Sequence, residues 1–311
     1  MIEIKNLVKR YGKKLAVNGI SFTVNKGEVL GFLGPNGAGK STTMNIITGY
    51  LSSTSGSVVI NGHDILEEPE LAKKSIGYLP ELPPLYLDMT VIEYLDFMCD
   101  IKGVSKKDRA PQLAKIMSLV KIVDVGDRLI KNLSKGYKQR VGIAQAMIGN
   151  PEILILDEPT VGLDPNQIRE IRKLIRHLAQ NHTIIISSHI LSEIQAVCDR
   201  VVIINKGKVA AIDTIGDLST RLNEAKKILV AFKGDEKLVC NLLRAIPGVE
   251  NVYLRESRSA DIKQVEVSVM SENDVRSSIF YTMAKANSPI LEMRELDASL
   301  EEIFLSITKE A

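Results

Sequence analysis

A short glycine-rich segment carries residue types at a spacing that suits phosphate binding. Residues 34–41 read GPNGAGKS and match the pattern G-x-x-x-x-G-K-[ST]. The glycines let the backbone bend so that several N–H groups point inward, and Lys40 brings a positive charge to the β- and γ-phosphate oxygens. The Ser41 hydroxyl is left for Mg²⁺. The residues expected to hold the phosphates are Asn36, Gly37, Ala38, Gly39, Lys40, Ser41 and Thr42.

The segments on either side of this loop favour the same interpretation. Residues 29–33 read as a buried strand, and residues 42–48 read as a helix that ends at Gly49. A glycine-rich turn between two elements is the structural alternative. Because the phosphate-binding pattern requires a strand before it and a helix after it, the sequence favours a phosphate site.

Two adjacent carboxylates follow a second buried strand. Residues 153–156 are all apolar, and Asp157 and Glu158 come directly after them. This is typical of a central parallel strand whose C-terminal end faces a ligand. Together with a phosphate loop, Asp157 is expected to contact Mg²⁺ directly or through water. Glu158 is then placed to orient or deprotonate a water that attacks the γ-phosphate.

The sequence contains four histidines, and a functional role is predicted for one of them. His189 follows the apolar strand 183–187, at the same sheet edge as the phosphate loop, which favours a contact with the γ-phosphate. His63 lies beside an Asn-Gly hairpin turn, and His177 and His182 lie on and after a predicted helix. These three are expected at the surface with no specific task.

For four further residues, local structure gives part or all of the interpretation. Tyr11 can cover a strand edge or stack on a flat base such as adenine, and the two are equally supported. Glu81 opens a proline-rich loop after the predicted strand 75–80. Ser134 suits an N-cap, yet a helix start also offers N–H groups to an anion. Asp164 is explained by capping alone, since Pro165 follows it.

Length and composition limit the class of protein. A chain of 311 residues is long enough for two domains. Its 40 basic and 38 acidic residues nearly balance, so no nucleic-acid partner is expected. Three scattered cysteines fit a reducing compartment. Since no signal peptide and no ~20-residue apolar window is found, we expect a soluble, cytoplasmic chain that reaches a membrane only by docking on another chain.

The order of patterns predicts a domain at residues 1–215, a linker at 216–226 and a second domain at 227–311. Within the first domain, residues 1–24 read as half-buried strands and about 88–150 as a helical subdomain, with Thr90 and Glu93 spaced as a capping box. The second domain reads βαββαβ, which predicts a small ferredoxin-like α+β fold. Its expected strands are 228–233, 249–255, 262–270 and 289–294, and its expected helices are 236–245, 272–286 and 299–308.

The second domain offers no chemistry in its sequence. Its loop at residues 257–261 carries no pattern typical of a site. A regulatory, dimerising or packing role is therefore all that we predict for it.

Residues 1 to about 215 resemble the ATP-binding subunit of an ATP-binding cassette (ABC) transporter. The resemblance rests on several motifs in the right order, which is more specific than a phosphate loop alone. Besides Walker A (34–41), they are Walker B (153–157), the catalytic glutamate (Glu158), the signature sequence (133–137), the D-loop (162–164), the switch histidine (His189) and the adenine-stacking aromatic (Tyr11). The resemblance implies a P-loop NTPase fold, with a RecA-like core, an antiparallel β subdomain and a helical subdomain.

Two positions depart from the family pattern. The signature has Lys135 and the pair at 137–138 where glycine and glutamine are usual, but it keeps Ser134 and Gly136. Glu81 stands where a glutamine usually contacts Mg²⁺ and the transport partner, and a carboxylate cannot donate an amide hydrogen. This variant and the C-terminal extension with residues 299–304 are similar to bacterial exporters of the gliding-motility and sodium-export types, whose ATPase and membrane chains are separate.

The resemblance implies an ATPase that uses ATP and Mg²⁺, with metal contacts from Ser41, Glu81 and Asp157. It implies a homodimer or pseudo-dimer in which Ser134 and Gly136 of one subunit close over the ATP of the other. Asp164 would join this interface through the D-loop, and Glu158 and His189 would serve hydrolysis.

The partner that the resemblance implies is an integral-membrane permease chain at the cytoplasmic face of the membrane. Two other functions stay open from the sequence. One is a soluble ABC-type ATPase that acts as a switch on a ribosome or DNA complex, although neither a repeated cassette nor long heptads is present. The other is a plain P-loop kinase, which the signature segment and His189 disfavour.

Overall fold

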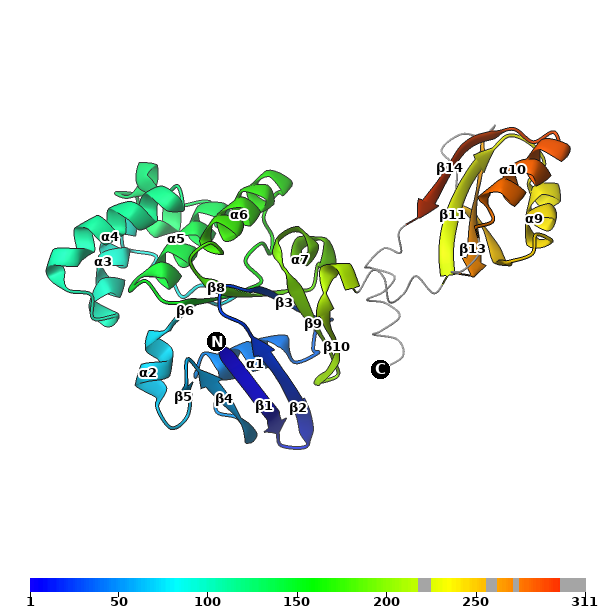
Figure 1. Ribbon diagram of the computed structural model, residues 1–311. Helices are drawn as coiled ribbons and strands as arrows, with labels where there is room; N and C mark the ends of the chain where they lie inside the picture. Colours follow the sequence, from blue (N-terminus) through cyan, green and yellow to red (C-terminus); the bar gives the residue numbers. More distant parts are fainter. Residues whose placement is uncertain (218–224, 256–261, 271–273, 297–311) are drawn as a thin grey trace. The chain divides into compact units, whose positions relative to one another are not determined.

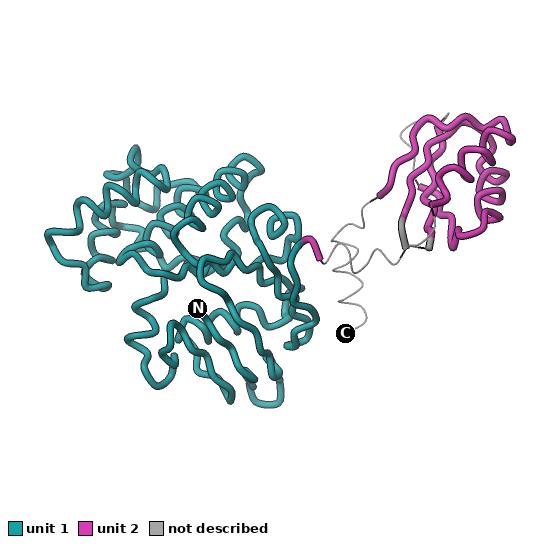
Figure 2. Tube along the Cα trace, in the orientation of Figure 1, with its two compact units in different colours: residues 1–215, 310–311 teal, residues 216–309 magenta. Residues whose placement is uncertain are grey.

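The structure is a computed structural model that describes residues 1–217, 225–255, 262–270 and 274–296. The chain divides into two units, Met1–Ile215 and a second unit that begins at Gly216 (Figure 2), and each unit has its own hydrophobic core. The loop at 257–261, the predicted last helix at 299–308 and the extension at 299–304 lie outside the described residues. Every helix in the described residues is too short or too polar to span a membrane.

A six-stranded sheet runs through the centre of the first unit in the order β10-β9-β3-β8-β7-β6 (Figure 1). The strands are β3 (Val29–Leu33), β6 (Ile76–Leu79), β7 (Ile153–Asp157), β8 (Thr183–Ser188), β9 (Arg200–Asn205) and β10 (Lys208–Thr214). All neighbours pair in parallel except β10, which is antiparallel to β9. Strands β3 and β7 are buried along their whole length because the sheet is covered on both faces, which explains their unbroken apolar runs.

The second sheet of this unit is antiparallel, in the order β2-β1-β4-β5. Its strands are β1 (Ile2–Tyr11), β2 (Lys14–Val24), β4 (Ser55–Ile60) and β5 (His63–Asp64). The predicted alternation in residues 1–24 and the Asn61-Gly62 turn are confirmed, and both turn residues have positive φ. Helix α1 (Lys40–Ile47) shares one core with this sheet and with the central sheet.

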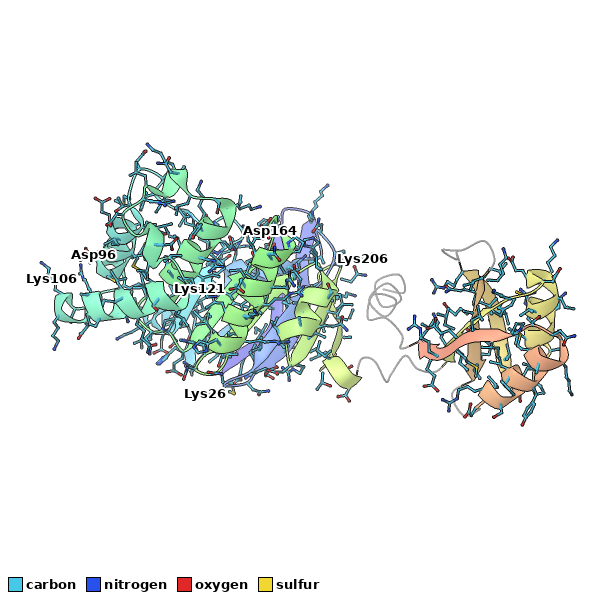
Figure 3. All side chains as sticks on the ribbon, turned by 90° about the horizontal axis from the view of Figure 1, so that it is seen from above. Lys26, Asp96, Lys106, Lys121, Asp164 and Lys206 are labelled. Carbon is cyan, nitrogen blue, oxygen red and sulfur yellow. The ribbon has the colours of Figure 1, made fainter. Side chains whose placement is uncertain are left out.

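Helices cover the other face of the central sheet (Figure 1). They are α5 (Lys135–Met147), α6 (Pro165–Leu178) and α7 (Leu191–Val197); α3 (Val91–Ile101) and α4 (Lys106–Leu119) pack beside α5, followed by two 3-10 turns, Val123–Val125 and Ile130–Asn132. The short α2 (Pro69–Lys74) lies on the opposite side, next to β5, where Ala72 joins the core that contains α1. The predicted capping box is confirmed, since Thr90 Oγ accepts from the Glu93 N–H and Glu93 accepts from the Thr90 N–H. Charges of both signs lie on this part, for example Asp96 and Lys106 (Figure 3).

Two predictions about the segment around α6 were wrong in detail. The expected buried stripe was right at Ile171, Ile175 and Leu178, but Leu174 is buried and Ile168 is only partly so. His182 was expected at the surface and is buried, with Nδ1 2.8 Å from the Pro151 carbonyl oxygen. The reason is the parallel pairing of β7 with β8, which brings the residues before both strands together.

The second unit has the predicted βαββαβ order. It consists of β11 (Ala225–Phe232), α9 (Glu236–Arg244), β12 (Val249–Arg255), β13 (Lys263–Met270), α10 (Arg276–Lys285) and β14 (Ile290–Leu296). The sheet order is β12-β13-β11-β14 and every pair is antiparallel. Alternate residues of the strands, among them Val230, Val265 and Val267, pack with α9 and α10 in one core, which is why the strands alternate in hydropathy.

Helix α5 approaches the central sheet at a glycine. A Cβ atom on Gly77 of β6 would lie 1.9 Å from the Ala146 carbonyl oxygen of α5, so only glycine allows this contact. At Gly126, by contrast, an added Cβ would meet only side-chain ends, the nearest being Ile92 Cδ1 at 3.0 Å.

We expect Gly77→Ala to lower the free energy of unfolding by about 1 to 3 kcal/mol, because α5 must move away from β6. Gly126→Ala is the matched control and should cost less, since flexible side-chain ends can shift. Urea unfolding of the full chain, followed by circular dichroism, checks both variants. Equal midpoints for the two variants would contradict the close helix–sheet contact.

Candidate functional site

A cavity of about 490 Å³ lies where the central parallel strands end. Leu33 of β3 pairs with Ser188 of β8, and Asp157 of β7 pairs with Ser187, so these three strands end at one level. The loops that follow them therefore meet. The cavity is lined by Tyr11, Lys14, Ala16, Asn36, Gly37, Gly39, Lys40, Ser41, Thr42, Glu81, Glu158, Val161 and His189.

The phosphate loop owes its shape to glycines at three places. Gly37 and Gly39 have φ of 79° and 108°, in the left-handed region that favours glycine. A Cβ on Gly34 would lie 2.4 Å from the Ile204 carbonyl oxygen, so the loop packs directly on the backbone of β9. Ala38 is buried and donates its N–H to the Pro35 carbonyl, which explains why it does not line the cavity.

Lys40, the first residue of α1, points back across the loop. Its Nζ donates to the Gly34 carbonyl oxygen at 2.8 Å and lies 3.9 Å from Glu158 Oε1. Burial lowers the pKa of Lys40, and the neighbouring carboxylates, Glu158 first among them, act in the opposite direction. The side chain is only 7% exposed, so its charge acts at short range on whatever enters the cavity.

Glu158 is held in an unusual backbone conformation. Its φ is 48°, a left-handed value that costs energy for a residue with a side chain. The Glu158 N–H donates to the Ser187 hydroxyl at 3.0 Å and approaches the Ser187 carbonyl at 3.2 Å, which fixes this conformation. Burial raises the pKa of Glu158, while its hydrogen bond with His189 acts to lower it.

His189 lies against Glu158, with 2.9 Å between His189 Nδ1 and Glu158 Oε2. The turn that carries it is fixed by a buried hydrogen-bond network. The Ser188 hydroxyl donates to Glu193 Oε2 at 3.1 Å and accepts from the Ile190 N–H, and the Thr160 hydroxyl also donates to Glu193. Sequence reasoning missed this network; its one signal was a pair of serines at the end of an apolar strand.

Asp157 and its neighbours suit a magnesium ion in residue type. Asp157 is 3% exposed, burial raises its pKa, and the Ser187 hydroxyl donates to its Oδ1. Among the described residues, no group of three or more His, Cys, Asp or Glu side chains could hold a metal by itself. Ser41, Glu81 and Asp157 offer oxygen donors of the type that Mg²⁺ prefers, and with nucleotides this ion also takes phosphate oxygens and water as ligands.

Tyr11 ends β1 at the rim of the cavity. The residue is 47% exposed, with Lys9 Nζ 5.3 Å from the ring centroid. Because Tyr11 is exposed and lines the cavity, its ring is available for stacking.

Besides the buried Ala38 and Asp157, three residues that the sequence associates with nucleotide binding do not line this cavity. Ser134 caps α5, with its hydroxyl 3.4 Å from the Tyr137 N–H, and Asp164 caps α6 through the N–H groups of residues 166 and 167. A Cβ on Gly136 would lie 2.8 Å from Gln167, so the starts of α5 and α6 are in contact. This second cluster is separate from the phosphate loop of the same chain.

Comparisons with known proteins identify the family of this chain. The family described as "ABC transporter" matches residues 17–161. The linearmycin resistance ATP-binding protein LnrL of Bacillus subtilis (strain 168) is 33% identical over 309 residues, 99% of this chain and 98% of that protein. The chain belongs to the ABC transporter ATP-binding proteins.

Other comparisons agree with this family. The lantibiotic transport ATP-binding protein SrtF of Streptococcus pyogenes is 42% identical over 210 residues, 67% of this chain and 89% of that protein. A solved ATP-binding subunit of an ABC transporter aligns with a TM-score of 0.66 at 31% identity, covering 72% of this chain and 93% of that chain. A dimeric bacterial ABC transporter cassette aligns with a TM-score of 0.64 at 26% identity, over 69% and 99% of the two chains.

This ABC protein is therefore the ATP-binding and ATP-hydrolysing subunit of a transporter, as the resemblance implied, and not a switch on a ribosome or DNA complex. The predicted α/β P-loop fold is confirmed. The match to LnrL spans nearly the whole chain, so the second unit is part of what the two proteins share.

The contact between His189 and Glu158 gives a prediction about pH. If Glu158 acts as a base, ATPase activity falls on the acid side as pH drops through its raised pKa. His189→Ala removes the hydrogen bond that lowers this pKa, so the pKa rises further and the acid limb moves to higher pH. We also expect a loss of kcat on the order of a hundredfold.

The measurement is the pH profile of kcat for the wild type and the variant. His177→Ala is the matched control, because His177 is an exposed histidine of α6, and it should leave the profile unchanged. An acid limb that stays in place in His189→Ala would show that the histidine does not act through Glu158.

Proposed function

We propose that the cavity binds the magnesium complex of ATP and that Glu158 and His189 serve hydrolysis. One observation carries the proposal: a single cavity collects the phosphate loop, the Glu158–His189 pair and an exposed aromatic ring. Residues 36–42, of which all but the buried Ala38 line the cavity, hold the phosphates, and Tyr11 stacks on the base. Ser41, Asp157 and Glu81 hold Mg²⁺, which when bound neutralises charge on the β- and γ-phosphate oxygens.

The geometry supports a separate role for each of Lys40, Glu158 and His189. Lys40 replaces its hydrogen bond to the Gly34 carbonyl with one to a phosphate oxygen. Its ammonium group therefore keeps a hydrogen-bond partner when the nucleotide binds. Glu158 takes a proton from water as the water oxygen forms a bond to the γ-phosphorus and the bond to the bridging oxygen of ADP breaks. His189 holds the carboxylate in position and adds a contact for the γ-phosphate.

A second copy of the chain completes the site in this proposal. Ser134 and Gly136 do not line the cavity of their own chain, yet the start of the 13-residue helix α5 offers unpaired N–H groups that suit a γ-phosphate. A head-to-tail dimer would place this helix start, and Asp164 beside it, over the partner's nucleotide. The similarity to a dimeric ABC cassette supports this arrangement.

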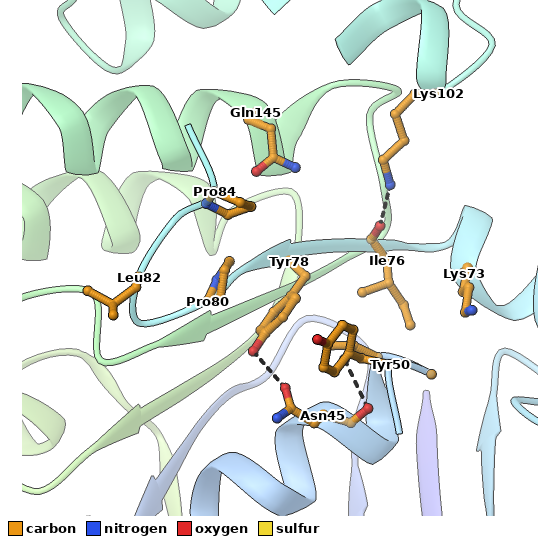
Figure 4. A pocket seen from close by; sticks show the side chains of 12 residues that line it. Asn45, Tyr50, Lys73, Ile76, Tyr78, Pro80, Leu82, Pro84, Lys102 and Gln145 are labelled. Carbon is orange, nitrogen blue, oxygen red and sulfur yellow. Dashed lines mark hydrogen bonds between the residues drawn. The ribbon is translucent and has the colours of Figure 1, made fainter. Parts of the chain in front are cut away.

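A groove of about 730 Å³ beside the loop after β6 supports docking of a membrane chain (Figure 4). Tyr50 and Leu82 line it and are 83% and 81% exposed, more than any other large apolar side chain of the described residues. Lys102 also lines it, with Nζ donating to the Ile76 carbonyl at 3.1 Å and no carboxylate partner in the described part.

We assign the groove to a separate permease chain that contributes an apolar segment with an acidic residue. Apolar side chains this exposed favour a protein partner, and the ammonium of Lys102 would pair with the acid. The subunit would then be peripheral, at the cytoplasmic face of the membrane. The second unit is left with a regulatory, dimerising or packing role.

Glu158→Gln should bind ATP, hydrolyse it slowly and accumulate as a dimer, because only the base is lost. Gel filtration with ATP and Mg²⁺ measures this. Glu152→Gln is the matched control, since Glu152 is exposed at the opposite end of β7 and should behave as wild type. Adding Ser134→Glu to Glu158→Gln should abolish the dimer by repulsion. A persistent Glu158→Gln monomer would contradict the composite site.

Leu82→Glu should detach the subunit from membranes while its own ATPase activity stays within a few-fold of wild type. Val123→Glu is the matched control, because Val123 is also a well-exposed apolar residue but lies away from the groove lining. Sedimentation of membranes from cells that express each tagged chain gives the membrane-bound fraction. Equal fractions for both variants would exclude the groove as the docking surface.

A further inference from the structure

The five-residue loop Pro80-Glu81-Leu82-Pro83-Pro84 separates two cavities. Glu81 lines the nucleotide cavity together with Lys40, Ser41 and Glu158. Pro80 and Leu82, its neighbours, line the groove instead. Because three of the five residues are prolines with fixed φ, the loop backbone has little freedom to carry Glu81 away from the cavity.

Glu81 adds a negative charge to a cavity whose lining already contains Glu158 and the buried Lys40, and the buried Asp157 also acts on Lys40. Its field reaches the other charged groups: it raises the pKa of Asp157 after the larger effect of burial, and it partly offsets the lowered pKa of Lys40. Lys14, an exposed residue of β2, is the other cation of the lining.

This charge acts differently on the two forms of a nucleotide. A metal-free triphosphate carries more negative charge than its magnesium complex, so a nearby carboxylate repels it more strongly. The same carboxylate attracts a divalent cation and offers it an oxygen ligand. A neutral amide at this position would do neither through charge.

We propose that Glu81 makes this subunit discriminate against metal-free nucleotide, so that ATP enters the cavity only as its divalent-metal complex. The proposal rests on the proposed function, since it takes the cavity as the nucleotide site. Because Glu81 is exposed to solvent, salt screens its effect, and we expect discrimination to be greatest at low ionic strength.

The test measures the dissociation constant of a fluorescent ATP analogue for the full chain, once with Mg²⁺ and once with EDTA. The ratio of the two constants is the discrimination. In Glu81→Gln we expect this ratio to fall about tenfold, or about 1.4 kcal/mol, mainly because binding in EDTA improves. Raising the salt concentration should reduce the difference between the ratio of the wild type and the ratio of the variant.

Two further variants test whether the charge at position 81 is the cause of the change in the ratio. Glu81→Asp keeps the charge and should keep a ratio close to that of wild type. Asp88→Asn removes one negative charge from an exposed residue that does not line the cavity, and it should leave the ratio unchanged.

Each other outcome has one meaning. An unchanged ratio in Glu81→Gln, equal losses of binding in both buffers, or a Glu81→Asp variant that behaves like Glu81→Gln would overturn the role of Glu81 while leaving the nucleotide site in place. No binding by the wild type in either buffer would instead overturn the proposed function.

Discussion

The structure depends on the burial of opposite charges at one edge of the central sheet. Lys40, Asp157 and Glu158 are each less than a tenth exposed, and Lys40 Nζ lies within 4 Å of Glu158. Burial of an unpaired charge costs several kcal/mol, so removal of one partner would penalise the others. The burial is tolerated because each group has partners: a carbonyl for the lysine, Ser187 for Asp157 and His189 for Glu158.

These partners come from the parallel register of three strands. The pairing of Asp157 with Ser187 lets one hydroxyl donate to the carboxylate and accept from the N–H of Glu158. That second bond stabilises the left-handed backbone at Glu158, which turns its side chain toward the cavity. A shift of β8 by one residue would remove both hydrogen bonds, so the strand pairing and the chemistry cannot be separated.

The sequence predicted the parts of the site that depend on local pattern. The phosphate loop, the apolar strands and the caps at Thr90, Ser134 and Asp164 follow from neighbouring residues, and the structure has each of these elements in place. Features that depend on pairing between distant segments were not predictable. The burial of His182 and the Ser187–Asp157 hydrogen bond both require the register of β7 and β8, which no local pattern contains.

Helix α5 connects the nucleotide cavity of the first unit with the second cluster, which is formed by the starts of α5 and α6. Helix α5 begins at the Ser134 cap, and at Gly142 it packs so closely that an added Cβ would lie 2.6 Å from Leu79 Cδ1 and 3.1 Å from Pro83. Leu79 and Pro83 flank the segment that carries Glu81. Since packed interiors have little free volume, this segment cannot move without moving α5 or breaking the contact. A change of charge beside Glu81 in one nucleotide cavity therefore affects the position of the start of α5. In the proposed dimer, this helix start covers the nucleotide cavity of the partner subunit.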